Sequence, residues 1–276
     1  MANLYGKRRS ILPELPDVEV FKQYIDATSL HQKVKDVEIR SRQILEGTSA
    51  QKLKTELEGR AFESTQRHGK HLFVQLDDGH WLMLHFGMTG DLKYFKDMEK
   101  DTPHDRLLFS FFNGYHLAYD SQRKLGEVER IEDIEQFVEE RELGPDALDP
   151  DLDFAAFKQA LAGRRAMAKS ALMNQQIIAG IGNVYSDEIL FQAGVHPRTK
   201  MNQLDEETLA EIFNVMKRVL RTAIDCRADP DQFPESYIIP HRHGDGKCPR
   251  CGGELKRVKV SGRSAYYCPN CQGEQR

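Results

Sequence analysis

Four cysteines near the C-terminus have the spacing of a metal site. Cys248 and Cys251 form one C-x2-C pair, and Cys268 and Cys271 form a second, with sixteen residues between the pairs. Two turns that each offer two thiolates can surround a tetrahedral metal, and this spacing is typical of zinc ribbons. Two disulfides are the alternative, which a chain without an export signal disfavours because its thiols stay reduced. We predict one structural zinc ion without a catalytic role, and Cys226 lies outside the pattern.

The segment between the two cysteine pairs is basic and aromatic. It contains Lys256, Arg257, Lys259, Arg263, Tyr266 and Tyr267. A short hairpin of this composition can contact phosphates with one face and pack against the metal site with the other. A hairpin with a merely solvated surface fits the composition equally well, so its ligand has to be inferred from the rest of the chain.

The formal net charge of −4, taken as a whole, argues against a nucleic-acid partner, because binding to a phosphate backbone requires positive charge that displaces counterions. The charge is unevenly distributed, however. Residues 127–153 hold twelve acidic side chains against two arginines, a local charge of −10, which leaves +6 for the rest. We interpret the acidic run as a solvated face or a linker. The distribution permits DNA binding without requiring it.

Length and composition fit a globular protein with two domains. The chain has 276 residues, of which 39% are hydrophobic and 30% charged, enough for two separate cores. No apolar run approaches the roughly 18 residues that span a bilayer. Residues 1–12 lack the apolar core of a secretory signal. We therefore expect a cytoplasmic protein without a membrane partner.

The elements that must position these residues are strands in the first half of the chain. Residues 71–76 and 81–86 are rich in apolar side chains and are separated by a turn sequence. Residues 107–112 and 115–119 flank Asn113-Gly114, a strong hairpin signal. This half is predicted to be mostly β.

Apolar residues recur at helical spacing in three other places. They are Val18, Phe21 and Ile25; Phe154, Phe157 and Leu161; and Leu209, Ile212, Phe213, Met216, Val219 and Leu220. The first group predicts a helix that begins near Pro13 or Pro16, where a missing amide hydrogen costs least. The other two predict a helical second domain from about residue 150, followed by the cysteine-rich segment.

Four segments in this order resemble the formamidopyrimidine-DNA glycosylase and endonuclease VIII family. They are PELPDVE at residues 13–19, HFGMTG at 85–90, GIGNVY at 180–185, and the four-cysteine finger with Arg263. The resemblance extends from Pro13 to Cys271, and Pro-Glu-Leu-Pro favours the formamidopyrimidine branch. A zinc ribbon on an unrelated nucleic-acid enzyme would require the three upstream matches to be coincidence.

The resemblance implies an α+β fold with three parts. Residues 13–150 would form an N-terminal helix and a β-sandwich, residues 151–235 a helix-two-turn-helix domain, and residues 236–276 the zinc finger. Residues 1–12 would be an extension that is not native or is removed. The implied protein is a monomer of bacterial or archaeal type, and its partner is double-stranded DNA that contains damaged bases.

The implied activity is that of a bifunctional DNA glycosylase and AP lyase in base-excision repair, which removes oxidised bases. An N-terminal proline offers a secondary amine that can attack the sugar C1′, expel the base and remain attached as an iminium, or Schiff base. By the family motif, Pro13 is this nucleophile and Glu14 the acid that protonates the opening sugar ring. The iminium makes β,δ-elimination possible. Lys70 matches the phosphate-binding lysine of the sandwich domain, although a charged strand end is its plain alternative.

The resemblance also implies the residues that hold DNA. Asn183 begins an expected helix, whose free backbone amides and side-chain amide could hold a phosphate, and Arg263 matches an arginine that grips phosphates beside the flipped nucleotide. Met88, Arg123 and Leu125 match the side chains that fill the gap left by the flipped base, with Arg123 facing the orphaned base. A place in the hydrophobic core is the alternative for Met88 and Leu125.

The start of the chain departs from the family. Pro13 follows twelve residues, and a nitrogen in a peptide bond is not a nucleophile. Proteolysis could expose Pro13, or the protein could be a non-catalytic binder of damaged or abasic DNA. We favour a third explanation, a start codon read as methionine at the position of Leu12, with a ribosome-binding sequence encoding Lys7-Arg8-Arg9.

Lesion choice is a second departure. The segment 226–247 is shorter than in typical formamidopyrimidine glycosylases, in which part of it caps a flipped 8-oxoguanine. Leu125 stands where that branch usually has phenylalanine. The expected substrates are therefore formamidopyrimidine or 8-oxoguanine type purines, with room for oxidised pyrimidines.

Overall fold

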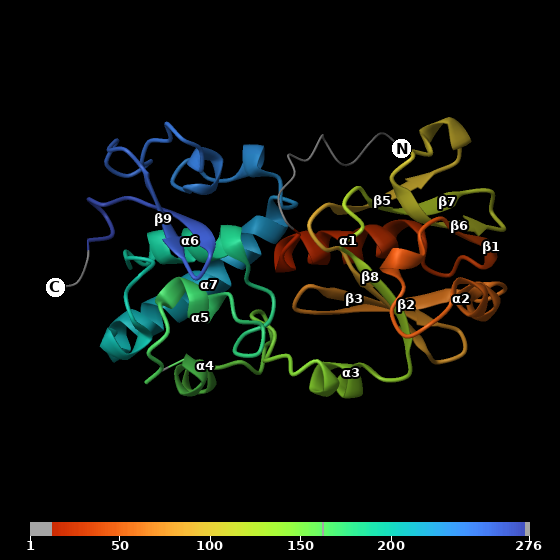
Figure 1. Cartoon of the computed structure of the whole chain (residues 1–276), viewed down its shortest axis with the longest axis horizontal. Helices are drawn as coiled ribbons and strands as arrows, with labels where there is room; N and C mark the ends of the chain where they lie inside the picture. The colour runs from red at the N-terminus through yellow and green to blue at the C-terminus, as the bar shows by residue number, and fades with distance from the viewer. Residues whose placement is uncertain (1–12, 162, 274–276) are drawn as a thin grey trace. The chain divides into compact units, whose positions relative to one another are not determined.

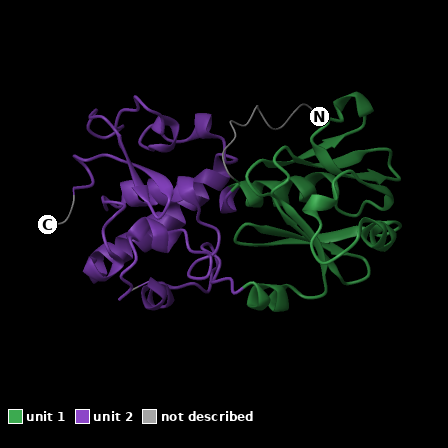
Figure 2. Ribbon diagram, viewed as in Figure 1, with its two compact units in different colours: residues 1–13, 17–141 green, residues 14–16, 142–276 purple. Residues whose placement is uncertain are grey.

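The computed structural model describes residues 13–161 and 163–273, shown along the chain in Figure 1. The chain divides into two compact units, coloured separately in Figure 2. Of the described residues, unit 1 comprises Pro13 and 17–141, and unit 2 comprises 14–16 and the residues from 142 onward. Glu14 and the first two residues of α1, which begins at Leu15, therefore belong to the second unit.

Unit 1 contains two four-stranded antiparallel sheets (Figure 1). The first has the order β1 (Val34–Ile39), β6 (Asp105–Phe111), β7 (His116–Ser121) and β5 (Gly90–Phe95). The second has the order β2 (Phe62–His68), β3 (His71–Leu76), β4 (Trp81–His85) and β8 (Glu127–Ile131). The helices of this unit are α1 (Leu15–Thr28), α2 (Ala50–Leu57) and α3 (Ile134–Glu140), with short 3-10 turns η1 (Arg42–Ile44) and η2 (Met98–Lys100).

One hydrophobic core joins both sheets of unit 1 to the first helix. It takes Val18, Phe21 and Ile25 from α1, as their helical spacing predicts, and the inward residues of both sheets. The predicted hairpins are present: Asn113-Gly114 joins β6 to β7, and a short turn joins β3 to β4. Gly114 has a positive φ of 80°, which glycine adopts without steric cost.

Part of the acidic run is structured rather than a linker. Its first residues form β8, which pairs with β4 and buries Val128, and the next form α3, which buries Phe137. The guanidinium of Arg141 contacts Glu127 at 3.2 Å and Glu129 at 3.1 Å. Buried apolar residues such as Val128 and Phe137 hold these short elements in place. Their sequences are otherwise rich in charged residues, which is why the pattern of residues did not predict them.

Unit 2 is helical and ends in a small hairpin. Its elements are α4 (Phe154–Leu161), α5 (Ala168–Leu172), α6 (Asn183–Gln192), α7 (Glu206–Asp225), β9 (Lys256–Val260) and β10 (Arg263–Tyr267), with 3-10 turns η3 (Met201–Gln203), η4 (Pro230–Gln232) and η5 (Ile239–His241). Asp205 caps α7 by accepting the Thr208 amide. The predicted stripe of α7 is buried, apart from Phe213, which packs its ring against Phe157 and is partly exposed. Among the described helices, none combines the length and apolar character of a membrane span.

Candidate functional site

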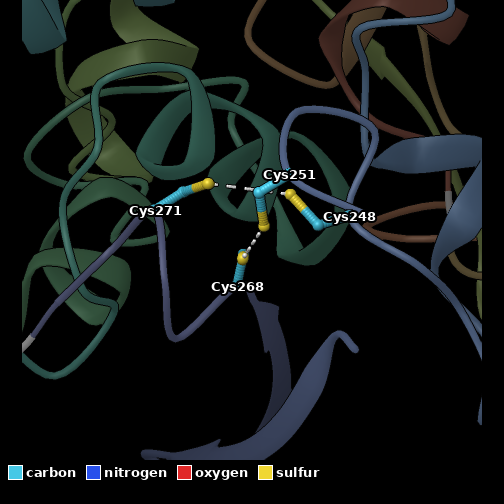
Figure 3. A group of neighbouring side chains, drawn as sticks. All are labelled: Cys248, Cys251, Cys268 and Cys271. Atoms are coloured by element: carbon cyan, nitrogen blue, oxygen red, sulfur yellow. Dashed lines mark hydrogen bonds between the residues drawn. The ribbon is translucent and has the colours of Figure 1, made fainter. Parts of the chain in front are cut away.

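The four cysteines of the predicted metal site lie close together in unit 2 (Figure 3). Their sulfur atoms all lie within 4.8 Å of one another. The Sγ atoms of Cys248 and Cys271 are 3.8 Å apart, and those of Cys251 and Cys268 are 3.5 Å apart. A tetrahedral zinc ion with Zn–S bonds of about 2.3 Å requires sulfurs about 3.8 Å apart. The geometry fits zinc, and both separations exceed the length of a disulfide bond, about 2.05 Å.

The electrostatics of the cluster also favour a divalent cation. The backbone amide of Gly253 lowers the pKa of Cys251 to about 6, which favours the thiolate that binds metal. Burial and the neighbouring sulfurs raise the pKa of Cys271 to about 12. A bound cation would offset both the burial of charge and the repulsion among four thiolates.

The finger is attached to the rest of unit 2 by apolar packing and by Gln272. Cys248 and Cys268 are buried with Phe191 of α6 and with Ile238. The buried Gln272 donates from Nε2 to the Val195 carbonyl at 2.8 Å and accepts the Cys268 amide at 2.9 Å. Gln272 was not among the residues predicted from the sequence, in which its only signal is its position directly after the last cysteine.

The hairpin of the finger has two different faces. Lys256, Arg257, Lys259 and Arg263 are exposed. The aromatic residues contact unit 2 instead: Tyr266 lies under the Arg242 guanidinium at 5.2 Å, and Tyr267 packs edge-on against His196 at 4.6 Å. The outward face with its cations agrees with the predicted hairpin, whereas the aromatic face, which was expected to pack against the metal site, packs on Arg242 and His196.

Glu14 occupies the N-terminus of α6. Its carboxylate accepts the amide of Gly182 at 2.6 Å, of Val184 at 2.7 Å and of Tyr185 at 3.3 Å. Only 1% of its surface is exposed. The prediction that these amides are free for a phosphate is therefore wrong, because the N–H groups at the start of the helix donate to Glu14 instead. Asn183 still begins the helix, and its Oδ1 is buried without a hydrogen-bond partner among the described residues.

The glycines before α6 make room for this contact. A Cβ on Gly182 would lie 2.4 Å from Cδ of Glu14. Gly180 has a φ of 112°, and a Cβ there would lie 2.5 Å from Leu15. The Leu15 amide donates to the Gly180 carbonyl at 3.0 Å. The GIGNVY motif therefore folds closely around the residues that follow Pro13.

A buried ionic cluster joins α6 to the hairpin, and the sequence analysis missed it. Lys169, wholly buried in α5, donates to Asp187 at 2.6 Å and to the Asn183 carbonyl at 2.8 Å. The second oxygen of Asp187 accepts from Arg242 at 2.8 Å and from the Tyr266 amide at 3.1 Å. Burial lowers the pKa of Lys169, and the contact with Asp187 opposes this shift. The one sign of this cluster in the sequence is Lys169 itself, a lysine among small and apolar residues.

In unit 1, Lys70 lies in the tight turn between β2 and β3. Gly69 of this turn has a φ of 56°. The guanidinium of Arg67 supports the turn by donating to the Gly69 carbonyl at 3.2 Å and to Glu19 at 2.8 Å. His71, directly after Lys70, stacks on His85 at 5.0 Å, and burial lowers the pKa of His71 to about 3.

The structure brings Met88, Arg123 and Leu125 to one place in unit 1. Met88 lies in the turn between β4 and β5, and a Cβ on the preceding Gly87 would lie 2.3 Å from the Leu125 carbonyl oxygen. Arg123 is exposed, Leu125 is 49% exposed and Met88 is partly exposed. None of the three is a core residue, so the alternative placement in the hydrophobic core does not apply.

Comparison with known proteins identifies the family. The chain matches the formamidopyrimidine-DNA glycosylase N-terminal domain over residues 12–128, the H2TH domain of the same glycosylase over 143–233, and the zinc finger found in FPG and IleRS over 246–273. These three matches cover most of the chain and include both units and the finger.

Individual relatives agree with this assignment. The chain is 34% identical to the formamidopyrimidine-DNA glycosylase of Moorella thermoacetica, over 94% of this chain and 92% of that protein. It is 30% identical to the Streptococcus pneumoniae R6 enzyme, over 95% and 99%. Solved structures of the Lactococcus lactis glycosylase are also similar. The structure with DNA containing Fapy-dG has a TM-score of 0.85 and 28% sequence identity, and the structure with abasic-site DNA has a TM-score of 0.84 and 29% identity. Each match covers 95% of this chain and 100% of that chain.

The fold, the finger and these matches place the chain among zinc-finger DNA glycosylases with a helix-two-turn-helix domain. It belongs to the formamidopyrimidine-DNA glycosylase family. The resemblance inferred from four motifs is confirmed, and so are the α+β fold, the enzyme class and the structural zinc site.

Proposed function

We propose that this protein is a base-excision repair glycosylase and AP lyase that acts on double-stranded DNA with damaged bases. Its family membership supplies the enzyme class, and the solved relatives hold DNA with Fapy-dG or an abasic site. The observation that carries the proposal is the position of Glu14: its carboxylate is held by the first amides of α6, directly beside Pro13 in the chain.

Pro13 and Glu14 divide the chemistry between them. With a free amine, the nitrogen lone pair of Pro13 forms a bond to C1′ while the bond from C1′ to the base breaks. The Pro13 nitrogen passes its proton to the departing base. Glu14 then donates a proton to O4′ as the bond between C1′ and O4′ breaks, and the nitrogen lone pair forms the iminium with C1′. Loss of a C2′ proton then expels the 3′ phosphate, and a second elimination expels the 5′ phosphate.

Two basic side chains and one amide side chain bind the DNA backbone. Lys70, Asn183 and Arg263 contact phosphates around the flipped nucleotide, while Met88, Arg123 and Leu125 fill the gap in the duplex. Support for this assignment comes from the exposed hairpin face and from the shared position of the three gap-filling residues. We place the protein in the cytoplasm, on the nucleoid when it is bound to DNA, as a monomer.

One observation favours a second candidate, a non-catalytic binder of damaged or abasic DNA. In the printed sequence Pro13 follows Leu12, so its nitrogen is an amide. We propose that translation from the position of Leu12, or removal of residues 1–12, which lie outside the described residues, frees the amine. Amino-terminal sequencing of protein made from the native gene distinguishes these routes from a chain that keeps Leu12.

The proposed lesions are formamidopyrimidine and 8-oxoguanine type purines, with oxidised pyrimidines as further substrates. A panel of duplexes, each with one defined lesion, tests this with protein that begins at Pro13. We expect base release and a one-nucleotide gap with phosphates at both ends.

Glu14→Gln should lower the single-turnover rate of base release about 10²- to 10⁴-fold while affinity for the duplex changes little. Unchanged base release in this variant would contradict the role of Glu14.

A further inference from the structure

The loop from Ser121 to Gly126 is exposed but has a fixed backbone. The side chains of its central four residues are exposed, including Arg123 and Leu125. Lys124 has a φ of 53°, a conformation that a residue with a side chain keeps only where its surroundings hold it. Contacts from two other segments hold this loop.

The first contact comes from the turn that carries Met88. The Oγ1 of Thr89 accepts the Arg123 amide at 3.1 Å. Gly87 of the same turn lies against the Leu125 carbonyl, where a Cβ would approach to 2.3 Å. The residues on both sides of Met88 therefore contact the backbones of the two other gap-filling residues, Thr89 through its hydroxyl and Gly87 through close packing.

The second contact comes from β6. The guanidinium of Arg106 donates from Nε to the Ser121 carbonyl at 2.8 Å, and from Nη1 to the Pro103 carbonyl at 3.0 Å. The Ser121 amide donates to the His104 carbonyl at 2.9 Å. Arg106 thus ties the start of the loop to a strand of the sheet. A planar guanidinium suits this role because its donors reach several carbonyls in one plane.

We propose that Thr89 and Arg106 are positioning residues, which join the Met88 turn and the 121–126 loop into one preformed wedge. The wedge fixes the depth at which Arg123 meets the orphaned base. A loop that is ordered before DNA arrives loses less conformational entropy on insertion than a mobile loop would. This inference rests on the proposed function, since it presumes that Met88, Arg123 and Leu125 enter the duplex.

A matched pair of variants isolates the hydroxyl of Thr89. Thr89→Val keeps the branched shape but removes the acceptor, and Thr89→Ser keeps the acceptor. Single-turnover base release is measured on one lesion placed opposite each of the four bases. Thr89→Val should slow release opposite the preferred base about five-fold, the effect of one net hydrogen bond, and should reduce the preference among opposite bases. Thr89→Ser should restore both the rate and the preference.

Arg106→Lys provides a second variant, which keeps the positive charge but loses the planar set of donors. We expect Arg106→Lys, like Thr89→Val, to reduce the preference among opposite bases. A role only in folding would slow release opposite all four bases equally and lower the melting temperature. The inference is overturned if the preference is unchanged in both Thr89→Val and Arg106→Lys.

Arg123→Ala separates this inference from the proposed function. If Arg123→Ala abolishes the opposite-base preference and Thr89→Val and Arg106→Lys leave it intact, only the positioning role fails. If Arg123→Ala itself retains the preference, the proposed role of Arg123 fails, and the inference fails with it.

Discussion

Glu14 and the turn before α6 define the geometry of the site at the scale of single residues. The carboxylate accepts amides that lie 168 to 171 positions away in sequence. Three hydrogen bonds to one carboxyl group hold that group in one orientation. Because Glu14 directly follows Pro13, its orientation also fixes the direction from which the chain reaches the site.

Gly182→Ala tests whether the fit around Glu14 matters for catalysis. The added methyl group would lie 2.4 Å from Cδ of Glu14, so the carboxylate has to move. We expect at least a ten-fold lower single-turnover rate of base release. Gly244→Ala is the matched control, because a Cβ there meets nothing within 4 Å. Equal rates in the two variants would show that the position of Glu14 is not critical.

His71→Phe tests the consequence of burying a histidine next to Lys70. The pKa of His71 is lowered to about 3, against about 6.5 in an unfolded chain. The unfolded state therefore gains a proton first as the pH falls, and stability is lost between about pH 6.5 and pH 3. Phenylalanine can keep the packing on Phe137 without this loss. Chemical denaturation should show a smaller loss between pH 8 and pH 5 in the variant, by on the order of 1–2 kcal/mol.

His104→Gln serves as the control for this measurement, since His104 is exposed in unit 1. The control should follow the wild-type dependence on pH. If His71→Phe loses as much stability as the wild type on acidification, His71 does not stay neutral in the folded protein.

The sequence predicted those site residues whose chemistry depends on local spacing. The four cysteines belong to two turns, so C-x2-C spacing alone places their sulfurs in pairs. The partners of Glu14 and the cluster of Lys169 with Asp187 could not be predicted, because they join residues far apart in sequence. An acidic residue near a proline and a lysine in an apolar stretch are each compatible with many other contacts.

At the scale of elements, helix α6 is the centre of unit 2. Its first turn binds Glu14, its Asp187 binds β10 through the Tyr266 amide, and its Phe191 packs on the finger. The helical stripes and the Asn113-Gly114 hairpin were predictable because each reflects a local periodicity or turn preference. Strand β8 was not, since its alternating acidic residues resemble a solvated segment.

Removal of zinc tests the finger as an element. The two buried cysteines are part of its small core, so a chelator should expose Phe191 and disorder the hairpin that carries Arg263. We expect weaker binding to DNA, loss of tyrosine signals in near-ultraviolet circular dichroism, and recovery on adding zinc. Cys226→Ser should retain one equivalent of zinc, because Cys226 lies outside the cluster. A finger that keeps its DNA affinity without metal would contradict the structural role.

At the scale of the whole molecule, the acidic and basic parts of the chain have separate tasks. The acidic run contributes a strand and a helix to unit 1, while the hairpin of unit 2 exposes four cations. A net charge of −4 is therefore a poor guide to the partner, since DNA meets a local surface. The order of the four motifs along the chain predicted the family, whereas the composition of the chain did not.

Reduction with borohydride during reaction with abasic duplex tests the central claim most directly. An iminium between protein and sugar becomes a stable covalent bond, which mass spectrometry can map to one residue. Protein that begins at Pro13 should give an adduct on Pro13, and the chain with Leu12 attached should give none. Absence of an adduct from protein beginning at Pro13, or an adduct on another residue, would contradict the assignment of Pro13 as the nucleophile.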